Sequence, residues 1–112
     1  MFNGIIYYLG EVKKISNTKK GKSIFIFSKI SLSKKSIGMS IACDGVCLTL
    51  VSYKNKVLEF YLLDETINRS KFKYLKIGDL INLELPLKFG QDISGHICQG
   101  HIDTTSKVIK II

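Results

Sequence analysis

Apolar and polar positions alternate along several short runs of this chain, and turn residues separate the runs. A period of two is typical of strands that bury one face. We expect strands at 5–14, 23–29, 39–43, 46–53, 57–63 and 80–85. One short helix is expected to begin at Asp64, which can cap it, with Glu65 in its first turn, and to run to about Phe72. Six short strands and one short helix predict an all-β fold, a six-stranded closed Greek-key barrel.

The stretch 40–50 predicts a hairpin whose two faces differ in character. Asp44-Gly45 between two apolar runs is a strong signal for a two-residue turn. Because strand neighbours alternate between faces, this turn places Cys43 and Cys47 on opposite faces, which argues against a disulfide or a shared metal between them. Period-two spacing predicts six core side chains: Val46, Leu48, Leu50, Leu58, Phe60 and Leu62.

The opposite face of the same two strands mixes apolar and polar side chains. Cys47 and Thr49 belong to it, together with Glu59, Tyr61 and Leu63. Such a face suits a planar heterocycle, since apolar groups contact the ring while hydroxyls and backbone amides bond its edges. The alternative is that Cys47 is simply a small buried hydrophobic residue.

Charge is the most unusual feature of the composition. The 112 residues suit one domain, or one domain and the start of a second, and carry a formal net charge of +8, with Arg69 as the only arginine. A basic surface attracts nucleic acid, but base readout favours arginine, so a lysine-rich solvated surface is the preferred interpretation. Phe25 and Phe27 share one strand face and would suit a barrel that binds single-stranded nucleic acid, although core packing is favoured. We therefore expect no nucleic-acid partner.

Targeting signals are not found in this sequence. No uncharged apolar run approaches the roughly 20 residues of a membrane span. The first residues lack a basic segment ahead of a long apolar run, so they do not predict a signal peptide. Three cysteines, an odd number, do not predict a disulfide framework. We expect a cytoplasmic protein without a membrane partner.

A metal site would draw on His96, Cys98 and His101. No fourth ligand stands nearby, and the two histidines would point in opposite directions in a regular strand. We therefore expect no metal. His101 is instead a candidate for proton transfer or hydrogen bonding, because an imidazole titrates near neutral pH.

The chain changes character after Pro86. The polar, glycine-containing segment 88–95 predicts a boundary there. Beyond it, Gly100-His101-Ile102 resembles Gly4-Ile5-Ile6 at a constant offset of 96 residues. We expect one barrel at 1–88 and the first strand of a second, similar unit at 95–112.

Five motifs together resemble one family, the riboflavin synthases. They are Met1 to Ile6, Ser40 to Leu50, Glu65-Thr66, Gly78 to Glu84 and Gly95 to Asp103, in the family's order and covering essentially the whole chain. Two positions depart from the family's pattern: Asn3 stands where threonine is usual, and Asp44 where asparagine is usual. The larger departure is length, since nearly all of the family's second barrel is missing.

The resemblance implies an enzyme of two similar lumazine-binding barrels per subunit, assembled as a homotrimer. It implies dismutation of two molecules of 6,7-dimethyl-8-ribityllumazine to riboflavin and a ribitylaminopyrimidinedione, through transfer of a four-carbon unit without cofactor or metal. The implied partners are this substrate and product. These 112 residues alone would then be a poor catalyst. The alternative is a lumazine- or flavin-binding paralogue without activity.

The resemblance also implies site residues, carried over by matched motif. The catalytic candidates are Ser40, Cys47 and His101. The ligand contacts are Gly4, Ile5, Ile6, Cys47, Leu48, Thr49, Tyr61, Leu62, Leu63, Asp64, Glu65, Thr66, Gly100, His101 and Ile102.

Overall fold

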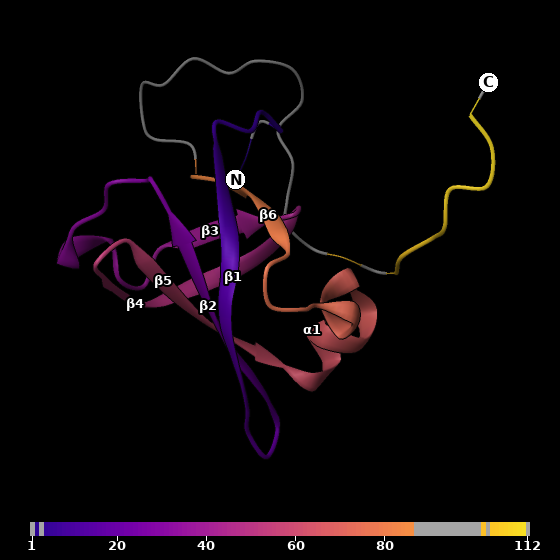
Figure 1. Ribbon diagram of the computed structural model, residues 1–112, viewed down its shortest axis with the longest axis horizontal. Helices are drawn as coiled ribbons and strands as arrows, with labels where there is room; N and C mark the ends of the chain where they lie inside the picture. Colours follow the sequence, from indigo (N-terminus) through magenta and orange to yellow (C-terminus); the bar gives the residue numbers. More distant parts are fainter. Residues whose placement is uncertain (1, 3, 87–101, 103, 112) are drawn as a thin grey trace.

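A computed structural model describes residues 2, 4–86, 102 and 104–111. In that part the strands are β1 (Tyr8–Asn17), β2 (Gly21–Ser28), β3 (Ser40–Cys43), β4 (Val46–Lys54), β5 (Val57–Leu63) and β6 (Leu80–Glu84) (Figure 1). The α-helix α1 (Asp64–Arg69) follows β5, and the short 3-10 helices η1 (Lys34–Ser36) and η2 (Lys71–Tyr74) lie in connections. The strands pair in the order β1-β2-β5-β4-β3-β6 and close through β6 and β1. The predicted six-stranded closed barrel with one short helix is confirmed.

The barrel core is apolar and continuous. All six side chains predicted to line it, Val46, Leu48, Leu50, Leu58, Phe60 and Leu62, are at most 5% exposed. They pack in one cluster with residues of the other strands, including Val12, Ile24, Ile81 and Leu83. Full burial of each such side chain contributes roughly 1.5–3 kcal/mol relative to exposure. The period-two prediction of the core is therefore confirmed.

The hairpin between β3 and β4 has the predicted two-residue turn. Asp44 and Gly45 have φ of 47° and 83°, the left-handed conformation that such turns require at both central residues. Ala42 pairs with Cys47 and Cys43 with Val46. Cys43 is buried in the core and Cys47 is exposed, which confirms that the two thiols lie on opposite faces.

The first strand lies further along the chain than predicted. Gly4, with φ of 81°, turns the backbone, and β1 begins only at Tyr8 instead of residue 5. At its other end, a register shift between Val12 and Lys14 bends the strand and lets it continue to Asn17. Because residues 5–9 are all apolar or aromatic, their pattern does not alternate and cannot mark where pairing starts.

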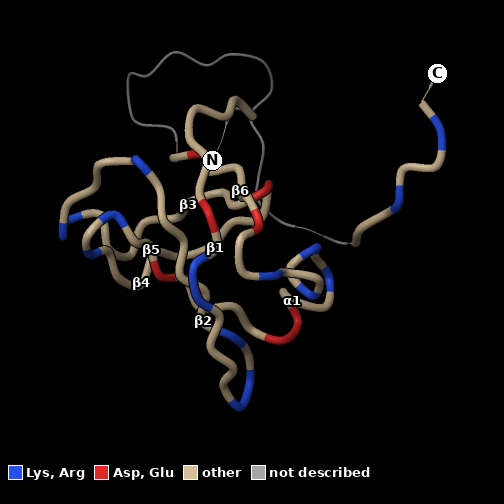
Figure 2. The backbone as a smooth tube through the Cα atoms, viewed as in Figure 1, with Lys and Arg blue, Asp and Glu red and all other residues tan. Residues whose placement is uncertain are grey.

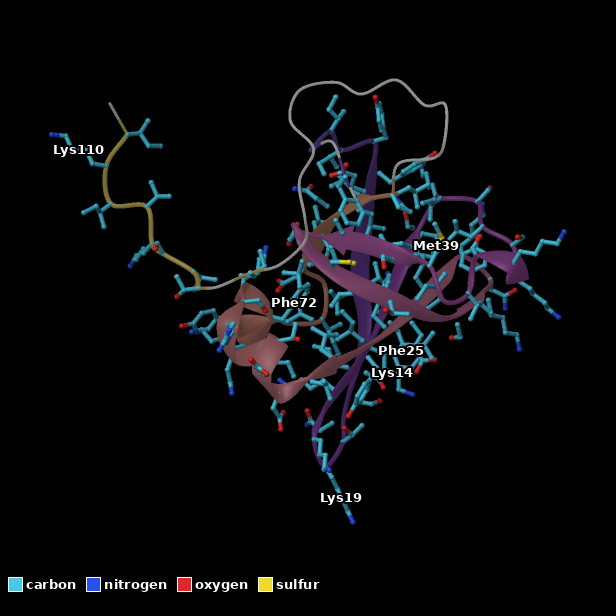
Figure 3. All side chains as sticks on the ribbon, turned by 180° about the vertical axis from the view of Figure 1, so that it is seen from behind. Lys14, Lys19, Phe25, Met39, Phe72 and Lys110 are labelled. Atoms are coloured by element: carbon cyan, nitrogen blue, oxygen red, sulfur yellow. The ribbon has the colours of Figure 1, made fainter. Side chains whose placement is uncertain are left out.

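The prediction that Phe25 and Phe27 pack in the core is wrong. Ile24 and Ile26 of β2 point into the core instead. Because neighbours along a strand alternate, the rings of Phe25 and Phe27 point outward, and Phe27 is 40% exposed. The ammonium of Lys14 lies 5.2 Å from the centre of the Phe25 ring, on the outer face of β1 and β2 (Figure 3). The strand is apolar on both faces, which is why its spacing did not show which face is buried.

The predicted helix divides into two elements. α1 includes Asp64 as its first residue, with Leu63 at the capping position, so Asp64 does not cap it with its side chain as predicted. The backbone N–H of Asp64 instead donates to the carbonyl of Lys20 at 2.9 Å, which ties the helix start to the β1–β2 hairpin. Ser70 then ends α1 and caps η2 by accepting from the N–H of the buried Phe72.

Beyond residue 86, only residues 102 and 104–111 are described, and none of them belongs to a strand. Ile102 packs partly against the barrel core, whereas Val108, Ile109 and Ile111 are exposed. The predicted boundary at 88–95 lies outside the described residues. The division into a barrel at 1–88 and a second unit from 95 therefore stays a prediction.

Basic residues are spread over the described surface. Figure 2 shows Lys and Arg at the hairpin tips, around α1 and along the C-terminal segment, with fewer acidic residues between them. The ion pairs between exposed partners, such as Lys13 with Glu11 and Arg69 with Glu65, contribute little stability because water screens them. None of the helices in the described segments has the length and hydrophobicity to cross a membrane.

Candidate ligand-binding face

Three of the predicted site residues lie together on the outside of the barrel. Residues directly opposite each other in an antiparallel pair point to the same face. Ser40 of β3 is opposite Thr49 of β4, and Ala42 is opposite Cys47. Cys47 and Thr49 are exposed, and Ser40 is half-buried. We call these four residues the β3–β4 outer face.

The backbone of β4 is also placed for binding at this face. The N–H of Leu50 donates to the carbonyl of Met39, so the backbone groups of Leu50 point toward β3. By alternation, those of Thr49 and Cys47 point to the other side, toward β5. The β4–β5 register, however, runs only from Leu50 to Lys54. The β4–β5 pairing therefore ends beside the β3–β4 outer face. There the edge of β4 lies next to the outward side chains of that face.

The predicted contacts at 61–66 begin next to this ladder end. Phe60 is the partner of Leu50, and Tyr61 follows it with its side chain outward, as does Leu63. The hydroxyls of Tyr61 and Thr18 lie 3.2 Å apart, which joins β5 to the β1–β2 hairpin. The remaining predicted contacts there open α1: Asp64 and Glu65 are exposed, and Thr66 is half-buried.

The N-terminal segment reaches the same face from the other side. The backbone N–H of Gly4 donates to Oε2 of Glu84 at 3.0 Å. Glu84 is opposite Ala42 on β3, and Ala42 is opposite Cys47 on β4. Gly4 is thereby connected to the β3–β4 outer face, with Ile5 half-buried and Ile6 exposed after it.

Other predicted contacts are placed differently. The side chains of Leu48 and Leu62 fill the core, so they offer only their backbone to a ligand. Ile102 is described but lies in no strand. Gly100 and His101 lie outside the described residues.

The zinc alternative draws on three side chains near the C-terminal end of the sequence. His96, Cys98 and His101 are outside the described residues. Within the part of the chain that is described, no group of three or more His, Cys, Asp or Glu side chains is arranged to hold a metal ion.

The two described cysteines differ in chemistry. Burial, and to a smaller extent the charges of Asp44 and Cys47, raises the pKa of the Cys43 thiol well above its ordinary value. A thiol that stays protonated and buried is a poor nucleophile. Cys47 is the exposed thiol, and it lies on the same face as Ser40 and Thr49.

Glu84 is the residue of this region that sequence reasoning did not single out as a site residue. It is buried, and a buried carboxylate usually has partners. The signal was present in the spacing: Ile81 and Leu83 belong to the core, so Glu84 had to point outward from β6. The spacing did not show that Gly4 lies beside it.

Comparison with known proteins shows which family the chain resembles. The model of the lumazine binding domain family matches residues 3–86. Riboflavin synthase of Buchnera aphidicola subsp. Baizongia pistaciae is 36% identical, over 96% of this chain and 51% of the relative. Riboflavin synthase of Escherichia coli K12 is 34% identical, over 100% of this chain and 53% of the relative. The chain thus spans about half the length of the curated relatives it matches.

Solved structures show the same similarity. The crystal structure of LumP complexed with 6,7-dimethyl-8-(1'-D-ribityl) lumazine matches with a TM-score of 0.75 and 28% identity, over 93% of this chain and 58% of that one. LumP complexed with riboflavin matches with a TM-score of 0.75 and 28% identity, over 93% of this chain and 56% of that one. The family model matches residues 3–86, three quarters of the chain, and the solved structures share its fold. The chain therefore belongs to the lumazine binding domain family, and the riboflavin synthases are among its relatives.

Proposed function

We propose that this chain binds 6,7-dimethyl-8-ribityllumazine and riboflavin at the β3–β4 outer face. We further propose that it contributes this site to the riboflavin synthase reaction. The observation that supports the proposal most is the meeting of Ser40, Cys47 and Thr49 beside the end of the β4–β5 ladder. The family match and the ligands of the LumP crystal structures support the choice of ligand.

A flat bicyclic ring has two needs that this region can meet. Its faces require apolar contact, which Ile6, Tyr61 and Leu63 offer from the two sides of the face. Its pyrimidinedione edge presents two carbonyl acceptors with an N–H donor between them. The backbone N–H and C=O groups along the edge of a strand alternate in the same way. The backbone of β4 beside Cys47 and the hydroxyl of Thr49 complement such an edge, at about 1 kcal/mol for each well-formed hydrogen bond.

The proposed chemistry is movement of a four-carbon unit from one lumazine to a second. It begins with removal of a proton from the C7 methyl of one lumazine, whose ring delocalises the resulting carbanion. Polar groups of the site, Ser40, Cys47 and His101, are the candidates for moving this proton. Holding the two rings face to face supplies much of the rate. In the complete protein, the second ring would bind to a second barrel of a neighbouring subunit in a homotrimer.

A fluorescence titration tests binding. Riboflavin is added to the purified chain, to Thr49→Ala and to Ser16→Ala, whose hydroxyl lies on β1, opposite β4 in the barrel order. We expect saturable binding by the parent chain and a loss of about 0.5–1.5 kcal/mol for Thr49→Ala. Ser16→Ala is the matched control and should bind as the parent does. Absence of saturable binding at millimolar riboflavin would overturn the proposal.

A turnover assay separates the enzyme from the binding-only alternative, which the likeness to LumP favours. Riboflavin formation from 6,7-dimethyl-8-ribityllumazine is measured for these 112 residues and for a version extended by a second barrel. We expect turnover by the extended version and little by the short one, since misplacing the rings by about 1 Å costs on the order of 100-fold in rate. Equal rates would contradict the two-barrel account. No turnover by the extended version would favour a binding protein.

A further inference from the structure

A buried carboxylate stands at the end of β6 on the outside of the barrel. Glu84 is 7% exposed although it points away from the core. Burial of a charged group is unfavourable unless hydrogen bonds compensate for the lost water. One such bond comes from the N–H of Gly4, eighty residues earlier in the sequence. Glu84 therefore joins the N-terminal segment to the barrel wall.

The N-terminal segment carries a buried side chain in addition to its hydrogen bond with Glu84. Phe2 is only 3% exposed, yet it is not part of the core cluster. Among the described residues, Phe2 and Ala42 are the two buried apolar residues outside that cluster. Ala42 is the direct partner of Glu84 across β3 and β6. The segment thus has a buried aromatic side chain at Phe2 and, two residues further on, a hydrogen bond from the N–H of Gly4 to Glu84.

The same row of residues continues into the candidate site. Glu84, Ala42 and Cys47 lie side by side on β6, β3 and β4. Neighbouring strands are about 4.8 Å apart, which separates the backbones of Glu84 and Cys47 by about 10 Å. A fused two-ring system fits within that span. Glu84 stands at one end of the row, where Gly4 is bound, and Cys47 stands at the other.

We propose that Glu84 is a positioning residue for the ligand site. Its carboxylate fixes Gly4, so that Gly4 to Ile6 form one wall of the site above the β3–β4 outer face. The inference rests on the proposed function, and it assigns Glu84 an action through the segment, without contact to the ligand. A wall that is already ordered before binding spares the ligand that ordering cost. Its loss should appear as faster ligand dissociation.

Backbone geometry at Gly4 supplies a second, independent way to disturb the wall. Gly4 has φ of 81°, a conformation that a residue with a Cβ adopts only with strain. A Cβ at this position meets no atom within 4 Å. Gly4→Ala therefore strains the segment without any clash with the barrel, and it should change ligand binding in the same direction as loss of the Glu84 carboxylate.

The experiment compares Glu84→Ala, Glu84→Gln and Gly4→Ala with two controls. Leu80→Ala changes an exposed side chain of the same strand, and Glu11→Ala removes a carboxylate from the outer face of β1. Riboflavin affinity and dissociation rate are measured by fluorescence, and hydrogen exchange of the Gly4 amide is measured in the free chain. We expect Glu84→Ala to bind about tenfold more weakly and to exchange the Gly4 amide faster, as loss of a bond to a charged acceptor predicts. Glu84→Gln should recover most of both, because its amide oxygen also accepts.

The outcomes separate the two proposals. Parent-like riboflavin affinity in both Glu84→Ala and Gly4→Ala overturns the positioning role. Weaker binding by Glu84→Ala with unchanged Gly4 exchange also overturns it, since the carboxylate would then act on the ligand directly. If Glu84→Ala does not fold, Gly4→Ala against the parent chain carries the same comparison. If the parent chain binds no riboflavin, the proposed function fails, and the ligand role of Glu84 fails with it. Hydrogen exchange at Gly4 still shows in that case whether the Glu84 carboxylate holds the Gly4 amide.

Discussion

Asp44 and Asn82 hold the β3–β4 turn against β6 through two hydrogen bonds. The backbone N–H of Asn82 donates to Oδ1 of Asp44 at 2.7 Å, and the backbone N–H of Asp44 donates to the carbonyl of Asn82 at 2.8 Å. Oδ2 of Asp44 faces the ammonium of Lys71 at 2.6 Å, which joins η2 to the turn. The two hydrogen bonds between Asp44 and Asn82 set the register of β3 with β6. That register in turn places Glu84, Ala42 and Cys47 in one row.

Replacement of Asp44 separates the two interactions of its side chain, with the N–H of Asn82 and with Lys71. Asp44→Asn keeps an acceptor for Asn82 and a side chain that tolerates positive φ, and it loses only the pair with the half-exposed Lys71. We expect it to lower the free energy of unfolding by about 1 kcal/mol or less. Asp44→Ala leaves the Asn82 N–H without its acceptor and strains the turn, at about 1–3 kcal/mol or more. Urea denaturation measures both, and equal losses would contradict this assignment of the bonds.

Core truncation tests the barrel packing. Phe60 is fully buried, so Phe60→Ala should destabilise the chain by about 3–5 kcal/mol, through lost burial and the cavity that remains. Leu80→Ala on an exposed position of β6 should change the unfolding free energy by less than about 0.5 kcal/mol. Thermal and urea unfolding give both values. A Phe60→Ala chain as stable as Leu80→Ala would mean that Phe60 does not lie in the core.

Thiol labelling tests the two faces of the hairpin. In a Cys98→Ser background, iodoacetamide at pH 8 should modify Cys47 and leave Cys43 intact, because burial keeps the Cys43 pKa high and the thiol inaccessible. Mass spectrometry identifies the modified residue. Saturating riboflavin should slow labelling of Cys47. Rapid modification of Cys43 in the folded chain would contradict the predicted and observed register.

The outward phenylalanines call for a direct test of nucleic-acid binding. Lysine ammonium groups lie over both rings: Lys14 over Phe25, and Lys13 over Phe27 at 5.9 Å from its centre. Lys13 also pairs with Glu11, so the rings are not free surfaces for stacking bases. We expect a single-stranded oligonucleotide to bind only weakly, with loss at physiological salt and no change in Phe27→Ala. Fluorescence anisotropy measures this, and salt-resistant binding that requires Phe27 would support the nucleic-acid alternative.

Much of the barrel is predictable because burial on one face leaves a period-two pattern. In β4 and β5, apolar side chains alternate with Cys47, Thr49 and Glu59, so face and register follow directly. In β2, Ile24 and Phe25 are both apolar, and the sequence holds no information on which one faces the core. The same ambiguity displaced the predicted start of β1.

The candidate site is less accessible to such reasoning, because it depends on which strands are neighbours. Spacing places Ser40 and Thr49 on a shared face once the Asp44-Gly45 turn is known. Nothing local connects Gly4 with Glu84, which closure of the barrel brings together. Long-range pairs of this kind follow from topology, and topology follows from the whole set of strands.

Mapping of ligand contacts by NMR shows directly whether the β3–β4 outer face binds the ligand. Backbone amide shifts of the isotope-labelled chain are followed while 6,7-dimethyl-8-ribityllumazine is added. We expect saturable shifts at Cys47 and Thr49 of β4, with Gly4 also affected, and no comparable shifts at Ser16 and Phe25 on the opposite side of the barrel. Saturable shifts confined to the β1–β2 side, or no shifts at millimolar ligand, would contradict it.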